Sequence, residues 1–124
     1  ESSLMLQCQL SLEESVANIL CFYRDSYWIW ETGLDAPSTY GMTEQECVER
    51  LQWGFSRMGR LDFGTVAEIM ARARKSGTNS NTVTLDSIND FNRAGIWEGY
   101  LTLDEIYQIY CVEKRSPTEE DAQD

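Results

Sequence analysis

Apolar residues recur at intervals of three and four along most of the chain, which is the spacing of one face of an α-helix. The first such stripe begins behind Ser11 and predicts a helix that runs to Tyr23. Ser11 and Glu14 have the spacing of a capping box, in which each side chain bonds the other residue's backbone N–H at a helix start. Residues 27–30, Tyr-Trp-Ile-Trp, alternate instead and fit either a strand or the edge of a helix. The stripe behind Ser11 is made of Leu12, Val16, Ile19, Leu20 and Tyr23.

Further amphipathic stripes follow a Gly-, Pro- and Ser-containing loop at residues 31–41 and predict additional helices. These helices are expected to begin at Thr43, Gly64, Thr84 and Thr102. The first and the last of them carry the capping-box spacing, because a glutamate stands three residues after the threonine. Their apolar residues are Val48, Leu51 and Phe55; Val66, Ile69, Met70 and Ala73; Leu85, Ile88 and Phe91; and Ile106, Tyr107, Ile109 and Tyr110.

Two short strand candidates repeat a Gly-x-Leu triplet at an interval of forty residues. They are Arg60–Asp62, behind Gly59, and Tyr100–Thr102, behind Gly99. The glycine would supply a positive-φ bend, and the two segments are expected to pair antiparallel with their leucines side by side in the core. The predicted fold class is therefore all-α: a tandem pair of helix–loop–helix units with a minimal two-stranded antiparallel link, plus an extra N-terminal helix.

A chain of 124 residues is long enough for one domain with its own core. We expect this domain to cover residues 1–115, with an N-terminal helical extension at 1–41 and the paired units at 42–115. Residues 116–124 are rich in acids and have almost nothing to bury, which predicts a disordered acidic tail.

The net charge of −11 changes the range of partners. Phosphate backbones and anionic membrane surfaces would be repelled, so we predict no nucleic acid and no membrane partner. No segment approaches the roughly 18 apolar residues of a membrane span. A basic partner protein is the natural complement, although acidity by itself also serves solubility.

The cysteines and the absence of histidine limit the chemistry. The chain has no His, which excludes a His-dependent catalytic triad or dyad. The cysteines are widely spaced, with no Cys-x-x-Cys pair, which disfavours a structural zinc site and fits reduced, mostly buried thiols in a cytoplasmic protein. No phosphate-cradling glycine loop or nucleophile motif is present, so we predict that the protein is not an enzyme. The cysteines are Cys8, Cys21, Cys47 and Cys111.

Four motifs carry a family resemblance. They are Thr-Glu-Gln-Glu at 43–46, Gly-Arg-Leu-Asp-Phe at 59–63, Ile-Met-Ala-Arg at 69–72, and Gly-Tyr-Leu-Thr at 99–102 with Asp-Glu behind it. In this tandem arrangement they resemble a pair of EF-hands, most closely those of the calmodulin and myosin light chain group, over residues 43–113. The resemblance implies that the Gly-x-Leu strands join two helix–loop–helix units into one lobe, with a groove between the helices that takes up an amphipathic helix.

The loops depart from that family, because a calcium loop needs oxygen ligands at fixed positions around its central glycine. Residues 25–33 also lack this spacing, so they are either a degenerate hand or an addition. We predict no calcium, no other metal and no cofactor. The ligand positions hold Gly54, Ser56, Met58 and Thr65 around Gly59, and Ala94, Ile96, Glu98 and Glu105 around Gly99, where Asp90 and Asn92 could contribute only across a two-residue insertion.

The function implied by the resemblance is that of a calcium-independent, EF-hand-like adaptor or light-chain-type regulatory subunit that binds an amphipathic, basic helix of a larger protein. The alternative is an acidic helical inhibitor or immunity protein that blocks a basic enzyme surface. Aromatic clusters are most often core, and the other reading of Trp28 and Trp30 is a partner anchor. The candidate partner-binding residues are Trp28, Trp30, Trp53, Phe55, Met58, Met70, Tyr107 and Tyr110.

Overall fold

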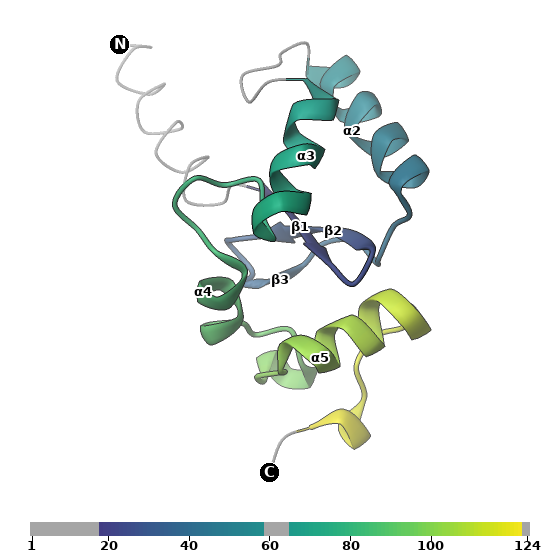
Figure 1. The fold of residues 1–124 in the computed structure, drawn as a ribbon. Helices are drawn as coiled ribbons and strands as arrows, with labels where there is room; N and C mark the ends of the chain where they lie inside the picture. Colours follow the sequence, from purple (N-terminus) through teal and green to yellow (C-terminus); the bar gives the residue numbers. More distant parts are fainter. Residues whose placement is uncertain (1–17, 59–64, 123–124) are drawn as a thin grey trace, which may run out of the picture.

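The computed structural model describes the backbone of residues 18–58 and 65–122, and the side chains of residues 18–53 and 65–122. At its centre lies an antiparallel sheet of three strands in the order β1-β2-β3. The strands are β1 (Asn18–Tyr23), β2 (Ser26–Glu31) and β3 (Ala36–Pro37). Helices lie above and below this sheet (Figure 1), so the fold is mixed α/β. The prediction of an all-α fold is therefore wrong.

β1 and β2 form a tight hairpin in which Cys21 lies opposite Trp28. The two turn residues, Arg24 and Asp25, both have left-handed backbone, with φ of 51° and 69°. Two positive-φ residues make a turn whose twist matches that of the flanking strands. The helix predicted from Ser11 to Tyr23 is wrong over residues 18–23, and residues 11–17 lie outside the described part of the chain.

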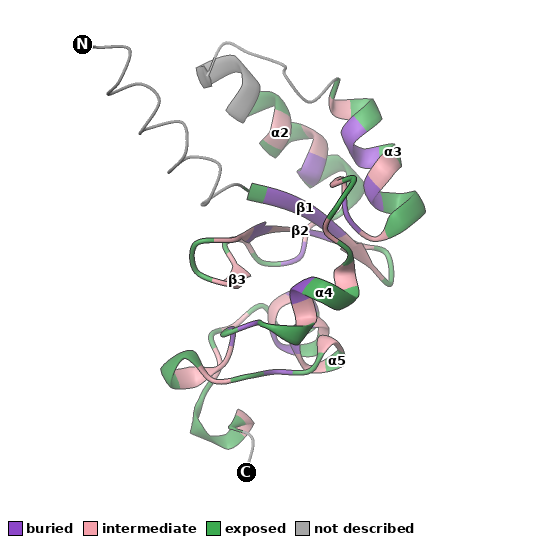
Figure 2. Cartoon of the chain, turned by 90° about the vertical axis from the view of Figure 1, so that its left-hand side faces the viewer, coloured by how far each residue is buried: buried purple, intermediate pink, exposed green. Residues whose placement is uncertain are grey.

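Residues 19–21 explain why the hydrophobic pattern misled. Ile19, Leu20 and Cys21 are all buried, at 7%, 4% and 0% exposure, because both faces of the strand are covered. A strand buried on both faces has a continuous apolar run, which satisfies helical spacing as well as strand alternation. Figure 2 shows this run of buried residues in β1.

Each face of the hairpin contributes to its own hydrophobic core. On one face lie α2 (Glu44–Met58) and α3 (Val66–Ser76), and on the other lie α4 (Leu85–Asp90), α5 (Leu103–Ile106) and the π-helix η2 (Tyr107–Glu113). The first core contains Leu20 and Tyr27 with Cys47, Ile69, Met70 and Ala73. The second contains Ile19, Cys21, Trp28 and Trp30 with Ile88, Ala94, Leu101, Ile106, Ile109 and Cys111.

This arrangement separates the two predicted helix–loop–helix units, because the sheet lies between them. The predicted strand at Tyr100–Thr102 is irregular backbone. Leu101 is buried at 1% exposure, but its N–H and C=O bond the Asn92 side chain at 3.0 and 2.7 Å instead of a strand. The proposed partner segment, Arg60–Asp62 with Leu61, lies outside the described residues. The sheet comes instead from residues 18–37, in the predicted N-terminal extension.

The helix starts at Thr43 and Thr102 are confirmed. The Thr43 N–H donates to Glu46 Oε1 at 2.9 Å, and the Glu46 N–H donates to Thr43 Oγ1 at 3.2 Å. Thr102 and Glu105 bond in the same reciprocal way at 2.8 and 3.2 Å. The helices predicted at Gly64–Arg74 and Thr84–Asn92 are present as α3 and α4, each behind a threonine cap. In the part of the chain that the structure describes, no helix has both the length and the apolar character needed to cross a membrane.

Gly41 brings residues 38–42 against η2. Its N–H donates to the Tyr110 carbonyl at 2.9 Å. A Cβ at this position would lie 2.7 Å from the Cα and Cβ of Cys111, closer than such atoms approach, so only glycine fits without movement. Gly41 and Tyr110 both line an open groove at this contact.

Candidate protein-binding surface

The loop from Phe91 to Leu101 is organised around a buried asparagine. Asn92 is 4% exposed. Its Nδ2 donates to the carbonyls of Leu101 at 2.7 Å and Asn89 at 2.8 Å. Its Oδ1 accepts the N–H groups of Leu101 at 3.0 Å and Ala94 at 3.2 Å. A side chain that bonds both ends of a loop holds it in one conformation, because buried backbone polar groups must find partners.

At the tip of this loop, a 3-10 turn (η1, Ile96–Glu98) holds a tryptophan outward. Trp97 and Glu98 both have left-handed backbone, with φ of 55° and 61°. The turn is closed by the Gly95 N–H bonding the Gly99 carbonyl at 2.8 Å. Bulky residues are rare in this conformation, and such local strain concentrates at functional sites. The Trp97 side chain is 74% exposed.

Arg93 joins this loop to the turn after β2. Its N–H donates to the Asp35 carbonyl at 2.7 Å. Its guanidinium lies 3.6 Å from the Asp35 carboxylate and 3.4 Å from that of Glu98. Because these side chains are partly exposed, the ion pairs contribute mainly to geometry. Together with the bonds of Asn92, they hold the loop in place.

A second segment, residues 117–120, lies beside the loop. A hollow of about 530 Å³ is lined by Ile96 from the loop and by Pro117, Thr118, Glu119 and Glu120 from this segment. Both glutamates are exposed. The hollow therefore carries negative charge, and Ile96, which lines it, is the residue directly before the exposed Trp97.

The C-terminal segment is held in place by a bidentate ion pair. The guanidinium of Arg115 donates to both carboxylate oxygens of Asp121, at 2.8 and 3.0 Å. Arg115 also contacts the Glu113 carboxylate. The Arg115 guanidinium, helped by the Thr118 N–H, holds the pKa of Asp121 well below its usual range. Residues 118–121 were predicted to belong to a disordered tail, but they form a capped 3-10 turn, η3 (Glu119–Asp121), below α5 in Figure 1.

The arrangement can bind a basic side chain. A lysine or arginine of a partner could enter the hollow toward Glu119 and Glu120, and a tryptophan face nearby attracts cations through its ring quadrupole. A second large aromatic residue, Phe91, is 75% exposed at the other end of the loop. Exposed aromatic residues are typical of protein-binding surfaces, and carboxylates on the same surface complement a basic partner.

Three of the residues predicted to bind a partner lie in the cores. Trp28, Trp30 and Met70 are 0%, 2% and 2% exposed. They present no surface to a partner in this fold, so the core reading of Trp28 and Trp30 is the one that their burial supports. Alternation in residues 27–30 reflects a strand.

The other predicted residues do not form one patch. Tyr107 is half-buried, packs edge-on against Tyr23 at 5.8 Å between ring centroids, and faces the Arg24 guanidinium 5.5 Å away. Tyr110 is half-buried, and its hydroxyl donates to the Ala94 carbonyl at 2.6 Å. Trp53 is 59% exposed on α2, on the opposite side of the sheet. The side chains of Phe55 and Met58 lie outside the described residues.

The sequence analysis did not predict that Trp97 and Phe91 would lie at the surface. Phe91 was assigned to the apolar stripe of a helix, but α4 ends at Asp90 and leaves it outside. Trp97 stands between Gly95 and Gly99, and a large aromatic residue flanked by glycines is a signal for an aromatic residue presented by a tight loop. The EF-hand pattern instead makes Gly99 the centre of a calcium loop, and this interpretation gives Trp97 no role at the surface.

Comparisons with protein-family models, with curated proteins and with solved structures find no match to this chain. Membership of the EF-hand family therefore remains a prediction. The described residues do not form the paired, all-helical architecture of that family. Among those residues, no group of three or more acidic or cysteine side chains is placed to hold a metal ion. The prediction that no metal binds is untested by this observation.

Proposed function

We propose that this protein binds a basic partner protein through the loop at 91–101 and the adjacent acidic hollow. The observation that carries the proposal is Trp97, which is held outward on a left-handed backbone directly after Ile96, the loop residue that lines the hollow together with Glu119 and Glu120. Backbone strain of this kind persists only where the surrounding structure enforces it, as Asn92 and Arg93 do here.

The proposed interaction combines an apolar anchor with charge. Burying an exposed tryptophan contributes more than an exposed ion pair, about 2 kcal/mol or more against about 0 to 1 kcal/mol. The net charge of −11 would speed the approach of a basic partner and select it over acidic proteins. The loop is ordered before binding, so little conformational entropy is lost on association.

An inhibitor that blocks a basic enzyme surface is one form that this function could take. The adaptor that clasps an amphipathic helix needs an apolar groove between paired helix units, and here these units lie on opposite faces of the sheet. The adaptor prediction therefore has no supporting observation among the described residues, whereas the acidic hollow beside Ile96 supports the inhibitor.

The test is an NMR titration with a hexa-arginine peptide, with hexa-glutamate as the probe of opposite charge. We expect the indole N–H signal of Trp97 to shift with hexa-arginine only. Trp97→Ala should weaken binding by roughly 30-fold, the size of a hot-spot loss of about 2 kcal/mol. The matched control is Trp53→Ala, which removes another exposed tryptophan on the far side of the sheet and should leave affinity unchanged.

Two results would contradict the proposal. Equal affinities of wild type and Trp97→Ala, with binding abolished by moderate salt, would show unspecific attraction between opposite charges. A larger loss for Trp53→Ala than for Trp97→Ala would place the binding surface on α2 instead. The double variant Glu119→Gln/Glu120→Gln tests the contribution of the hollow to binding separately from that of the tryptophan. It should weaken hexa-arginine binding while the fold stays intact.

A further inference from the structure

A second concave site is lined in part by Tyr110 of η2. It is a groove of about 710 Å³ between the start of α2, residues 37–42 and the end of η2. This size is in the range of sites for small organic ligands. Two cationic side chains, Arg50 and Lys114, line the groove in a chain whose net charge is −11.

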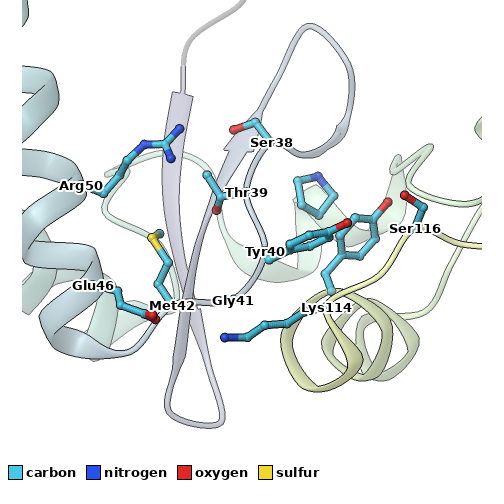
Figure 3. A pocket seen from close by; sticks show the side chains of 11 residues that line it. Ser38, Thr39, Tyr40, Gly41, Met42, Glu46, Arg50, Lys114 and Ser116 are labelled. Atoms are coloured by element: carbon cyan, nitrogen blue, oxygen red, sulfur yellow. The ribbon is translucent and has the colours of Figure 1, made fainter.

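Arg50 and Lys114 approach the groove from opposite walls (Figure 3). Arg50 projects from α2 with its guanidinium toward Ser38 and Thr39, whereas Lys114, the residue directly after η2, projects toward Gly41 and Glu46. Neither side chain forms an ion pair within 4.0 Å with any other residue that the structure describes. Lys114 has a left-handed backbone with φ of 53°, which ends the helix and directs its side chain.

The one carboxylate in the groove, Glu46, is already engaged. It accepts the Thr43 N–H at 2.9 Å in the capping box of α2. That bond, assisted by the positive charge of Lys114, lowers the pKa of Glu46, so this carboxylate stays ionised. With two cations and one anion, the groove has a local charge of +1 in a chain of net −11. The charges of distant acids are screened beyond about 8 Å at physiological salt.

Hydroxyl groups and an aromatic pair complete the lining. Thr39 Oγ1 accepts the Ile29 N–H at 3.0 Å, which leaves its own proton available to donate. The rings of Tyr40 and Tyr110 lie 6.3 Å apart at 44°, and Tyr40 is 44% exposed. Two cationic side chains and a hydroxyl donor suit a phosphate group, whose oxygens can accept several charge-assisted hydrogen bonds. The exposed face of Tyr40 offers a stacking surface for a flat ring.

We propose that this groove binds a small phosphate monoester that carries a planar ring, as a nucleoside monophosphate does. The phosphate lies between Arg50 and Lys114 and accepts hydrogen bonds from them and from Thr39. The ring packs against Tyr40. This site is independent of the surface around Trp97.

The test is a titration of the ¹⁵N-labelled full chain with AMP, with inorganic phosphate and adenosine as the two separate halves of the ligand. AMP should shift the amide signals of residues 38–42, Arg50 and Lys114, and should bind more tightly than either half alone. Arg50→Gln and Lys114→Gln should each weaken AMP binding by about tenfold or more, as expected for a lost charge-assisted hydrogen bond. Lys75→Gln removes the same charge from an exposed position at the end of α3 and should have no effect.

Several results would overturn this proposal. Adenosine binding as tightly as AMP would show that the phosphate is not recognised. A loss for Lys75→Gln equal to that for Lys114→Gln would show only long-range charge. A tyrosine-phosphorylated peptide that binds more tightly than AMP would identify the groove as a peptide surface rather than a small-molecule site. Unchanged spectra at 10 mM AMP, a concentration far above that of a useful site, would exclude the site altogether.

Discussion

Asn92 performs, with one side chain, the task that the predicted strand at Tyr100–Thr102 was expected to perform. In a strand the N–H and C=O of Leu101 would bond a neighbouring backbone. Here they bond Oδ1 and Nδ2 of Asn92. The same side chain caps α4 through the Asn89 carbonyl. One buried amide therefore connects α4, the Trp97 loop and the start of α5.

The residue-scale prediction follows from those bonds. Asn92→Ala would leave the buried N–H and C=O of Leu101 without partners, so the free energy of unfolding should fall by at least about 2 kcal/mol. Urea unfolding followed by circular dichroism measures this loss. Asn81→Ala, at an exposed position, is the control and should stay within about 0.5 kcal/mol of wild type. A similar result for both variants would mean that the loop is held by other contacts.

At the scale of elements, the C-terminal turn η3 depends on one ion pair more than on packing. The segment Pro117–Ala122 contains no buried residue, and Arg115 with Asp121 attaches it to the end of η2. A segment held in this way responds to pH, because protonation of the aspartate removes the charge that the guanidinium binds.

The element-scale prediction concerns acid. The pKa of Asp121 is lower in the folded protein than its unfolded value of about 3.9, so the contribution of the pair is complete above that pH. It is lost as the pH falls further, through the folded pKa. We expect the amide signals of residues 118–121 to move toward random-coil positions below about pH 4, ahead of those of α3.

Asp121→Asn should produce the same released turn at pH 7. Glu120→Gln should not, because the Glu120 side chain forms no hydrogen bond or ion pair with the residues that the structure describes. If the turn keeps its signals in Asp121→Asn, packing of Pro117 and Ile96 holds it instead. Release of the turn would also open the acidic hollow, so hexa-arginine binding should weaken in this variant.

At the scale of the whole molecule, the hairpin divides the interior into two cores, and buried cysteines lie in both. Cys21 and Cys111 belong to one core and Cys47 to the other. Burial raises the pKa of Cys47 and of Cys111 to about 11, and raises that of Cys21 further. The structure describes all three as free thiols.

The whole-molecule prediction is alkaline destabilisation. Unfolded thiols ionise near pH 8.5, whereas the folded thiols stay protonated to about pH 11. Their stabilisation is therefore complete below about pH 8.5 and is lost as the pH rises through the folded values. The urea midpoint should fall between pH 7 and pH 10. Cys47→Ala should show a smaller fall than wild type, and an equal fall would assign the effect to tyrosines and lysines.

Chemical labelling tests the burial of the thiols directly. In a Cys8→Ser background, the remaining cysteines should resist iodoacetamide at pH 8 until the protein is unfolded, because the thiolate is the reactive form and burial suppresses it. Rapid labelling of Cys47 alone would show that the core under α2 and α3 opens separately from the other.

The sequence by itself determined where the helices begin. Thr43, Thr84 and Thr102 stand at helix starts because capping is a local interaction between residues three apart, which the chain order alone specifies. The apolar stripe of α3 was also correct, because Ile69, Met70 and Ala73 form one buried face of a single helix. The acidity of the chain needed no structure either.

Only the tertiary structure decided which apolar segment became the sheet and which aromatic residues reached the surface. Residues 19–21 satisfy both helix and strand patterns, and the choice depends on helices more than twenty residues away that cover both faces of the strand. Trp28 and Trp97 have the same side chain, yet one is fully buried and the other 74% exposed. Burial is a property of contacts between distant segments, and no local spacing records it.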